Sequence, residues 1–252
     1  MRLKDKVSII TGGGSGIGQA SAIRMAAEGA KVVIWDINME GAAETEKTIK
    51  AAGGTAKVMN VDVMNWDKSH AAADEVVKEF GRIDVLVACV GGGKFNPWPT
   101  MTSDFWDKEI AFNLKTAVNC AHAVTGPMMK QKSGIIILFT SGKGYMGHPN
   151  LSGYGAGKAG VVSLMESLAA ELATHQIHVN VIGPGLTDTP LTRNQFEAWG
   201  DAGKQMYDNL KKKCAFGRVG EADDIAKVVV FLASDDAHWV HGQNILVGGA
   251  MV

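Results

Sequence analysis

Residues 7–23 read VSIITGGGSGIGQASAI, a short apolar stretch that passes through a glycine-rich turn into a helical one. The turn holds five glycines, at positions 12, 13, 14, 16 and 18. Glycine lets the backbone turn tightly and approach a ligand closely. The first N–H groups of the helix that follows have no partner within the helix. Strand, glycine turn and helix in this order therefore indicate a site for the phosphates of a nucleotide.

Short β-branched runs alternate with longer stretches of helical apolar spacing along the chain. Seven strands are predicted, over residues 7–11, 31–36, 56–61, 85–90, 135–140, 179–182 and 245–247. Six helices are predicted, over residues 16–27, 39–52, 66–80, 104–129, 154–175 and 221–233. No repeat or linker marks a second domain. The alternation therefore predicts one α/β domain over residues 1–252, with a Rossmann-like, doubly wound, seven-stranded parallel sheet and helices on both faces.

One segment, residues 183–220, fits no simple strand–helix unit. An insertion of that length at the end of a strand usually serves function, so residues 186–217 are predicted to form a substrate lid. Apolar side chains are expected to line the cleft beneath it, which favours a ring or alkyl body in the substrate, although each could instead pack the lid onto the domain. They are Phe95, Trp98, Met146, Leu151, Leu191 and Trp199.

Composition excludes several classes of function. Of 252 residues 46% are hydrophobic and 20% are charged, and the net charge of −1 gives no basic field for nucleic acid or anionic lipid. The three cysteines are too few and too widely spaced for a disulfide framework or a zinc site, and no metal is expected. No apolar stretch is long enough to span a membrane. These features predict a cytoplasmic protein without membrane or nucleic-acid partners.

An acidic residue closes the second predicted strand. Asp36 lies 18 residues beyond Gly18, where a carboxylate can accept hydrogen bonds from an adenosine ribose and would repel a 2′-phosphate. Ile37, not a basic residue, follows it. NAD is therefore favoured over NADP. The glycine spacing departs from G-x-G-x-x-G, so an ordinary glycine turn, and a turn-forming role for Asp36, stay open as alternatives.

A phenol and an ammonium lie four residues apart at Tyr154 and Lys158, hence on one helical face. A neighbouring cation favours the ionised phenol and lowers its pKa, which lets tyrosine exchange a proton near neutral pH. Ser141, 13 residues earlier, supplies a hydroxyl that could hold a substrate oxygen. A solvated helix face is the plain alternative for the Tyr154–Lys158 pair.

Taken together, these motifs resemble the short-chain dehydrogenase/reductase family over essentially the whole chain. The matching positions are Thr11-Gly12-x3-Gly16-x-Gly18, Asp62, Asn113, Ser141, Tyr154-x3-Lys158 and Pro184-Gly185. The resemblance implies that Tyr154 is the general acid/base, Ser141 orients the substrate oxygen, Lys158 lowers the tyrosine pKa and binds the nicotinamide ribose, and Asn113 holds a water. It implies a cofactor-binding set of Gly12, Ser15, Gly16, Ile17, Gly18, Asp36, Ile37, Asp62, Val63, Gly91, Tyr154, Lys158, Pro184, Gly185 and Thr187.

One stretch departs from the family pattern. Where the family carries Asn-Asn-Ala-Gly, this chain has Ala88-Cys89-Val90-Gly91, which puts local cofactor contacts in doubt. Cys89 could be a reactive thiol beside the cofactor or inert packing. Lys143 and Lys211-Lys212-Lys213 suggest an acidic or coenzyme A-linked substrate, or simply a solvated face.

These observations predict an NAD-dependent alcohol dehydrogenase or ketone reductase that acts on a small secondary alcohol or ketone. The alternatives are an NADPH-dependent 3-oxoacyl-carrier-protein reductase and a non-catalytic subunit of a hetero-oligomer. The resemblance also implies a homotetramer, in which the predicted helices over residues 104–129 and 154–175 pair between subunits.

Overall fold

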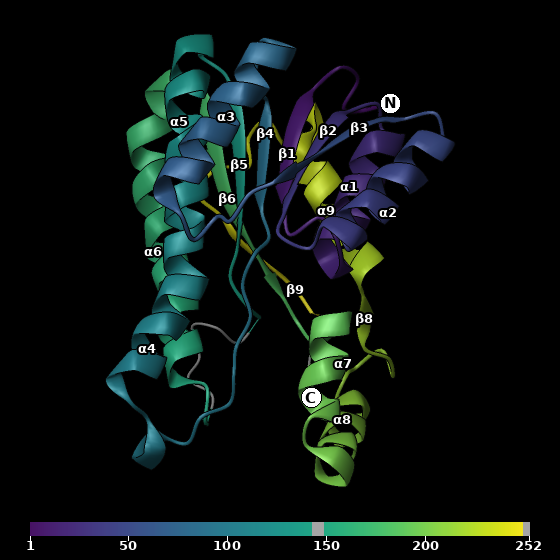
Figure 1. Ribbon diagram of the computed structural model, residues 1–252, viewed down its shortest axis with the longest axis vertical. Helices are drawn as coiled ribbons and strands as arrows, with labels where there is room; N and C mark the ends of the chain where they lie inside the picture. Colours follow the sequence, from purple (N-terminus) through teal and green to yellow (C-terminus); the bar gives the residue numbers. More distant parts are fainter. Residues whose placement is uncertain (143–148, 249–252) are drawn as a thin grey trace.

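The computed structural model describes residues 1–142 and 149–248, and a parallel seven-stranded sheet forms its centre (Figure 1). The order across the sheet is β3 (Thr55–Asn60), β2 (Lys31–Asp36), β1 (Val7–Thr11), β4 (Val85–Ala88), β5 (Gly134–Phe139), β6 (Ile177–Pro184) and β9 (Asn244–Val247). Every neighbouring pair is parallel. The chain reverses its direction of winding between β1 and β4, and ligands bind beyond the carboxyl ends of the strands at such a point.

Helices cover both faces of the sheet, as predicted. On one side lie α1 (Gly16–Ala27), α2 (Met39–Ala51) and α9 (Ala222–Ala233); on the other lie α3 (Trp66–Phe80), α5 (Thr116–Gln131) and α6 (Ser152–Leu172) (Figure 1). Ile34 and Trp35 of β2 are fully buried in different cores, because successive strand residues point to opposite faces. None of the helices in the described ranges combines the length and apolar character that crossing a membrane requires.

The helix predicted over 104–129 is not continuous. It consists of α4 (Ser103–Ile110), a wide π turn at Ala111–Lys115, and α5. Asn113 lies in the wide turn and donates from its Nδ2 to the Glu109 carbonyl, 3.0 Å away. Such π turns are frequent at functional sites, and apolar spacing alone does not reveal them.

The segment that fitted no simple unit is largely helical. It contains β7 (Thr187–Asp188), α7 (Pro190–Glu197), α8 (Gly200–Lys212) and β8 (Gly220–Glu221), and β7 pairs with β8. Thr189 caps α7 by accepting the Thr192 N–H at 3.2 Å, and Pro190 suits the first helical position. Figure 1 shows α7 and α8 beyond the carboxyl ends of the strands, opposite α4.

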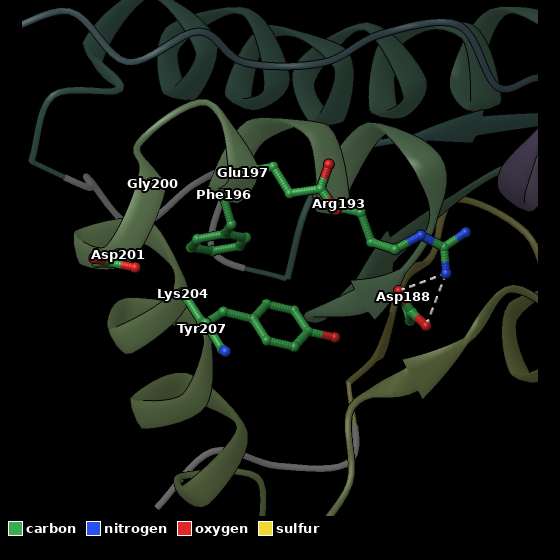
Figure 2. A pocket seen from close by; sticks show the side chains of 8 residues that line it. All are labelled: Asp188, Arg193, Phe196, Glu197, Gly200, Asp201, Lys204 and Tyr207. Carbon is green, nitrogen blue, oxygen red and sulfur yellow. Dashed lines mark hydrogen bonds and ion pairs between the residues drawn. The ribbon is translucent and has the colours of Figure 1, made fainter.

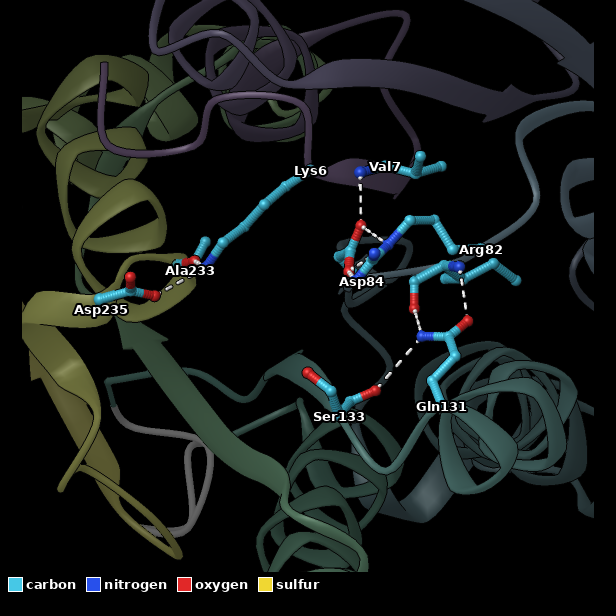
Figure 3. A network of polar contacts seen from close by, with 9 residues as sticks. Lys6, Val7, Arg82, Asp84, Gln131, Ser133, Ala233 and Asp235 are labelled. Carbon is cyan, nitrogen blue, oxygen red and sulfur yellow. Dashed lines mark hydrogen bonds and ion pairs between the residues drawn. The ribbon is translucent and has the colours of Figure 1, made fainter.

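Polar contacts join the elements at the opposite end of the sheet, where the amino ends of the strands lie (Figure 3). The buried Asp84 carboxylate accepts the Val7 N–H at 2.9 Å and pairs with Arg82. Gln131 bonds both the N–H and the carbonyl of Ile83, and Lys6 donates to the Ala233 carbonyl. Because each of these side chains is paired with a backbone group or with another side chain, the contacts at the amino ends are structural, and the site is sought at the carboxyl ends.

Candidate active site

A cleft of about 290 Å³ opens at the carboxyl ends of the central strands. Eight of the predicted catalytic and cofactor-binding residues line it together, although they come from separate stretches of the chain. They are Ile17, Gly91, Ser141, Tyr154, Lys158, Pro184, Gly185 and Thr187. Their convergence makes this cleft the candidate active site.

The glycine turn has a shape that only glycine allows at its tightest points. Gly12 and Gly16 have φ angles of +68° and +54°. A Cβ on Gly18 would lie 2.2 Å from the Gly12 carbonyl oxygen, so α1 packs directly on the turn. Ser15 precedes α1 in extended conformation and makes no side-chain hydrogen bond to it. The first N–H groups of α1 therefore remain available to an anionic ligand, which fits a pyrophosphate.

Asp36 lies beside this turn at the end of β2. Its Oδ2 accepts the Gly14 N–H and its Oδ1 accepts the Asn38 N–H, each at 2.8 Å. The next residue, Ile37, is 69% exposed. The carboxylate is thus fixed at the rim of the phosphate turn, in a position to meet a ribose.

The two residues expected near the adenine lie beyond β3. Asp62 accepts the Met64 N–H at 3.0 Å and turns the chain towards α3. The Val63 side chain is buried in the core, and its carbonyl accepts from Asn119 at 2.9 Å. The predicted contact of Val63 with adenine is therefore not available to its side chain.

Tyr154 and Lys158 project from the first turns of α6 into the cleft. The Ser141 hydroxyl lies close enough to Tyr154 to lower the pKa of the phenol. Lys158 is 4% exposed, and its ammonium donates to the Phe139 carbonyl at 2.9 Å. The three side chains thus meet at the end of β5, where a substrate oxygen could contact both hydroxyls.

The effect of Lys158 on the pKa of Tyr154 stays a prediction, and other neighbours also act on this tyrosine. Burial raises the pKa of Tyr154 above its ordinary value; Ser141 lowers it in smaller measure and Glu109 raises it further. The Lys158 ammonium is directed at the Phe139 carbonyl. Burial lowers the pKa of Lys158 to about 8, which makes its charge itself dependent on pH.

Asn113 holds the loop that follows β4. Its Oδ1 accepts the Gly92 N–H and its Nδ2 donates to the Gly92 carbonyl, both at 3.0 Å. A Cβ on Gly91 would lie 2.6 Å from the Lys158 Nζ. The loop backbone is therefore packed closely against the Lys158 and Asn113 side chains, while the predicted water at Asn113 stays a prediction.

The missing asparagines after β4 leave no gap in the strand pairing. The Thr11 hydroxyl accepts the Cys89 N–H at 3.0 Å, and Val90 packs against Gly12. Burial raises the pKa of Cys89 to about 12. A raised pKa disfavours the reactive thiolate, so it favours a packing role for Cys89, which also lines the cleft.

The apolar lining agrees with the sequence in part. Phe95, Leu151 and Leu191 line the cleft. The two tryptophans do not line it. Trp98 is 67% exposed, and the ring of Trp199 packs against that of Phe95 with 4.3 Å between the ring centroids. Met146 and Lys143 lie outside the described residues. Lining residues that the sequence did not suggest are Gly92, Gly93, Phe139, Thr140, Leu186, Thr189, Thr192, Gln195, Phe196, Met206 and Leu210.

A second cavity, of about 520 Å³, lies between α7 and α8 (Figure 2). Arg193 there is paired with Asp188 at 3.1 Å, and Tyr207 stacks edge-on against Phe196. It is larger than the cleft but contains none of the residues that the motifs indicated. The smaller cleft is therefore the better candidate for chemistry.

Comparison with known proteins agrees with this geometry. The enoyl-(acyl carrier protein) reductase family model matches residues 12–251. The chain belongs to the short-chain dehydrogenase/reductase family. It is 35% identical to a 3-oxoacyl-(acyl-carrier-protein) reductase of Thermotoga maritima over all of both chains. Levodione reductase has a TM-score of 0.94 at 34% identity, covering 98% of each chain. NAD⁺-bound xylitol dehydrogenase has a TM-score of 0.93 at 30% identity, covering 99% of this chain and 100% of the other.

The family is that of oxidoreductases that use a nicotinamide cofactor, and the resemblance seen in the motifs is thereby confirmed. The family does not fix which nicotinamide cofactor or which substrate this chain uses. The Ser141, Tyr154 and Lys158 side chains line the cleft, Ile17 brings the glycine turn to it, and Asn113 holds the adjoining loop at Gly92, an arrangement that fits such a cofactor.

Proposed function

We propose that this chain transfers a hydride between NAD(H) and a secondary alcohol or ketone with an apolar or cyclic body. The position of Asp36 carries the choice of cofactor. Its carboxylate is held at the phosphate turn by Gly14 and Asn38, and a second negative charge from a 2′-phosphate would meet it at short range. The apolar lining of the cleft, including Phe95, Leu151 and Leu191, favours the kind of substrate.

The side chains divide the chemistry among them. A bound nicotinamide supplies the hydride acceptor or donor. Ser141 and Tyr154 hold the substrate oxygen, and Tyr154 takes the hydroxyl proton in oxidation or returns it in reduction. Lys158 holds its ammonium beneath the site, and Asn113 fixes the loop that faces it. The α7–α8 hairpin, with Leu191 and its neighbours in the cleft wall, acts as the substrate lid.

The cofactor choice is tested by replacing Asp36. Asp36→Ala removes the ribose acceptor, so NADH affinity is expected to fall about tenfold. Asp36→Asn still accepts the Gly14 N–H but removes the charge, so NADPH affinity is expected to rise. Fluorescence titration of both cofactors measures both effects. An unchanged ratio of affinities in the two variants would show that Asp36 does not select the cofactor.

A second candidate is an NADPH-dependent 3-oxoacyl-carrier-protein reductase, which the identity to the Thermotoga maritima protein favours. Wild-type protein that binds NADPH more tightly and reduces a 3-oxoacyl thioester, but no free ketone, would establish it. The third candidate, a non-catalytic subunit, requires cofactor binding without turnover across a panel of cyclic, aromatic and coenzyme A-linked alcohols and ketones.

A further inference from the structure

A carboxyl group lies behind the candidate active site, where neither the motifs nor the chemistry above employ it. Glu109 is in α4, one helical turn before Asn113, and is 5% exposed. Its Oε2 accepts the Lys94 N–H at 3.2 Å. On its other side α6 passes so closely that a Cβ on Gly153 would lie 2.9 Å from the Glu109 Cβ. Burying a carboxylate costs free energy unless it is hydrogen-bonded or paired with a positive charge.

Glu109 and Asn113 together hold one short loop. Asn113 bonds the N–H and the carbonyl of Gly92, and Glu109 accepts the N–H of Lys94. Gly93, between the two held residues, supports the Tyr154 ring: a Cβ there would lie 2.8 Å from the Tyr154 Cγ. The Gly93 carbonyl also accepts from Gln195 of α7. The loop thus joins α4, the tyrosine and the lid.

We propose that Glu109 is a positioning residue of the active site, which fixes the loop under the Tyr154 ring and places a buried negative charge close to that tyrosine. The proposal deepens the proposed function, since it concerns the group assigned as the proton carrier. Glu109 itself acts through Lys94, Gly93 and the electric field at Tyr154, without contact with the substrate.

The charges around Glu109 determine the sign of its effect. Lys94 faces it from the loop and Tyr154 from α6; Asp104, Asp107 and Lys108 of α4 surround the outer pocket that it borders. Burial raises the pKa of Glu109, and Lys94 lowers it in smaller measure. A carboxylate here disfavours the phenolate and raises the pKa of Tyr154. Removal of the charge should therefore let Tyr154 ionise at lower pH.

The test is a direct titration of Tyr154 by tyrosinate ultraviolet absorbance, which needs no substrate. Each tyrosine gives one rise in tyrosinate absorbance as the pH increases. The chain has three tyrosines, so the absorbance step of Tyr154 is the one that Tyr154→Phe removes. Rapid pH jumps record it before alkaline unfolding. In Glu109→Gln, which is similar in size and still accepts the Lys94 N–H, the step is expected to move down by a few tenths to about one pH unit.

Two variants control for structure. Asp104→Asn removes an exposed carboxylate from the same helix and should leave the step where it is in the wild type. Glu109→Asp keeps the charge and should also leave it near the wild-type position. If Glu109→Gln does not fold, Glu109→Leu gives the same comparison with an apolar side chain. If the absorbance step of Tyr154 stays at the wild-type pH in the variant that lacks the Glu109 charge, the proposal is overturned.

Kinetics then separate this inference from the function on which it rests. If the enzyme oxidises a secondary alcohol, the rising limb of its kcat profile should move to lower pH in Glu109→Gln in parallel with the absorbance step. Absence of turnover in the wild type would count against the proposed function, while the absorbance result would still decide the role of Glu109.

Discussion

Tyr154 combines three features that suit a proton carrier: its ring packs on Gly93, Ser141 lowers the pKa of its phenol, and its side chain lines the cleft. Tyr154→Phe removes only the hydroxyl and keeps the ring on the loop. We expect kcat to fall about 100-fold or more while cofactor affinity holds, because general acid/base catalysis is worth that much.

Tyr207 offers the matched control for this measurement. It lies in the second cavity between α7 and α8, where no motif residue gathers (Figure 2). Tyr207→Phe should retain wild-type kcat. Full activity in Tyr154→Phe would remove Tyr154 from the mechanism.

The burial of Lys158 predicts how stability depends on pH. Its pKa falls from an ordinary 10.5 to about 8 on folding, so between these values the unfolded chain binds more protons than the native one. The free energy of unfolding should therefore rise with pH across this window and lose that contribution as pH falls through about 8. The full effect is on the order of 3 kcal/mol.

Urea denaturation without cofactor at pH values from 8 to 10.5 measures this contribution. Lys158→Met buries an apolar chain of similar length at the same position. The difference in unfolding free energy between wild type and variant should grow in favour of the wild type as pH rises. A constant difference would show that Lys158 titrates alike in both states.

How far the sequence predicts the site depends on whether its residues act through fixed spacing. Tyr154 and Lys158 lie four apart on one helix, so their shared face follows from helix geometry. Glu109 and Gln195 meet the loop at Gly93 and Lys94 only through packing between α4, α6 and α7. No pattern along the chain encodes such contacts, although three consecutive glycines after β4 do mark a close approach.

Among the elements, β1 and β4 meet at the point where the sheet changes its winding. Thr11, at the end of β1, is buried and accepts the N–H groups of Cys89 and Val90 at 3.0 and 3.4 Å. Thr11→Val has the same shape but leaves these donors without an acceptor. We expect the free energy of unfolding to fall by about 1–3 kcal/mol and cofactor binding to weaken.

Thr11→Ser retains the hydroxyl and serves as the control for this substitution. Urea denaturation and NADH fluorescence titration of the two variants give the comparison. Equal stability and affinity in Thr11→Val and Thr11→Ser would mean that side-chain packing, rather than the hydroxyl, joins the two strands.

Element prediction succeeded where one periodicity runs without interruption. Strands buried on both faces read as continuous apolar runs, and all seven were located within a few residues. The π turn at Asn113 escaped because the apolar spacing continues through it. The segment over 183–220 hid α7 and α8, whose outer surfaces are polar and whose capping at Thr189 is local.

For the whole molecule, the two ends of the parallel strands differ: the amino ends carry structural contacts and the carboxyl ends carry the cleft. At the amino ends, Arg82 donates to Asp84, Asp84 accepts the Val7 N–H, and Gln131 bonds the backbone of Ile83 (Figure 3). At the carboxyl ends, the glycine turn, the loop after β4 and the α7–α8 hairpin surround the cleft. This difference follows from the parallel sheet, because the loops that follow the strands all begin at the same end of the sheet.

Assembly is the last property that belongs to the whole molecule. We propose a homotetramer in which α5 and α6 pair between subunits, as the family resemblance implies. The outward face of α6 carries the exposed short side chains of Ser163, Ser167 and Ala170 beside the exposed Glu166, and the short side chains would let two helices approach closely. Light scattering after size exclusion should give a mass about four times 26.6 kDa.

Ala170→Glu places a charge on that face and should lower the mass, because an unpaired buried charge is costly. Ala51→Glu, exposed at the end of α2 on the other side of the sheet, should leave it unchanged. A tetramer that tolerates Ala170→Glu would place the interface elsewhere, and a wild-type monomer would end the proposal.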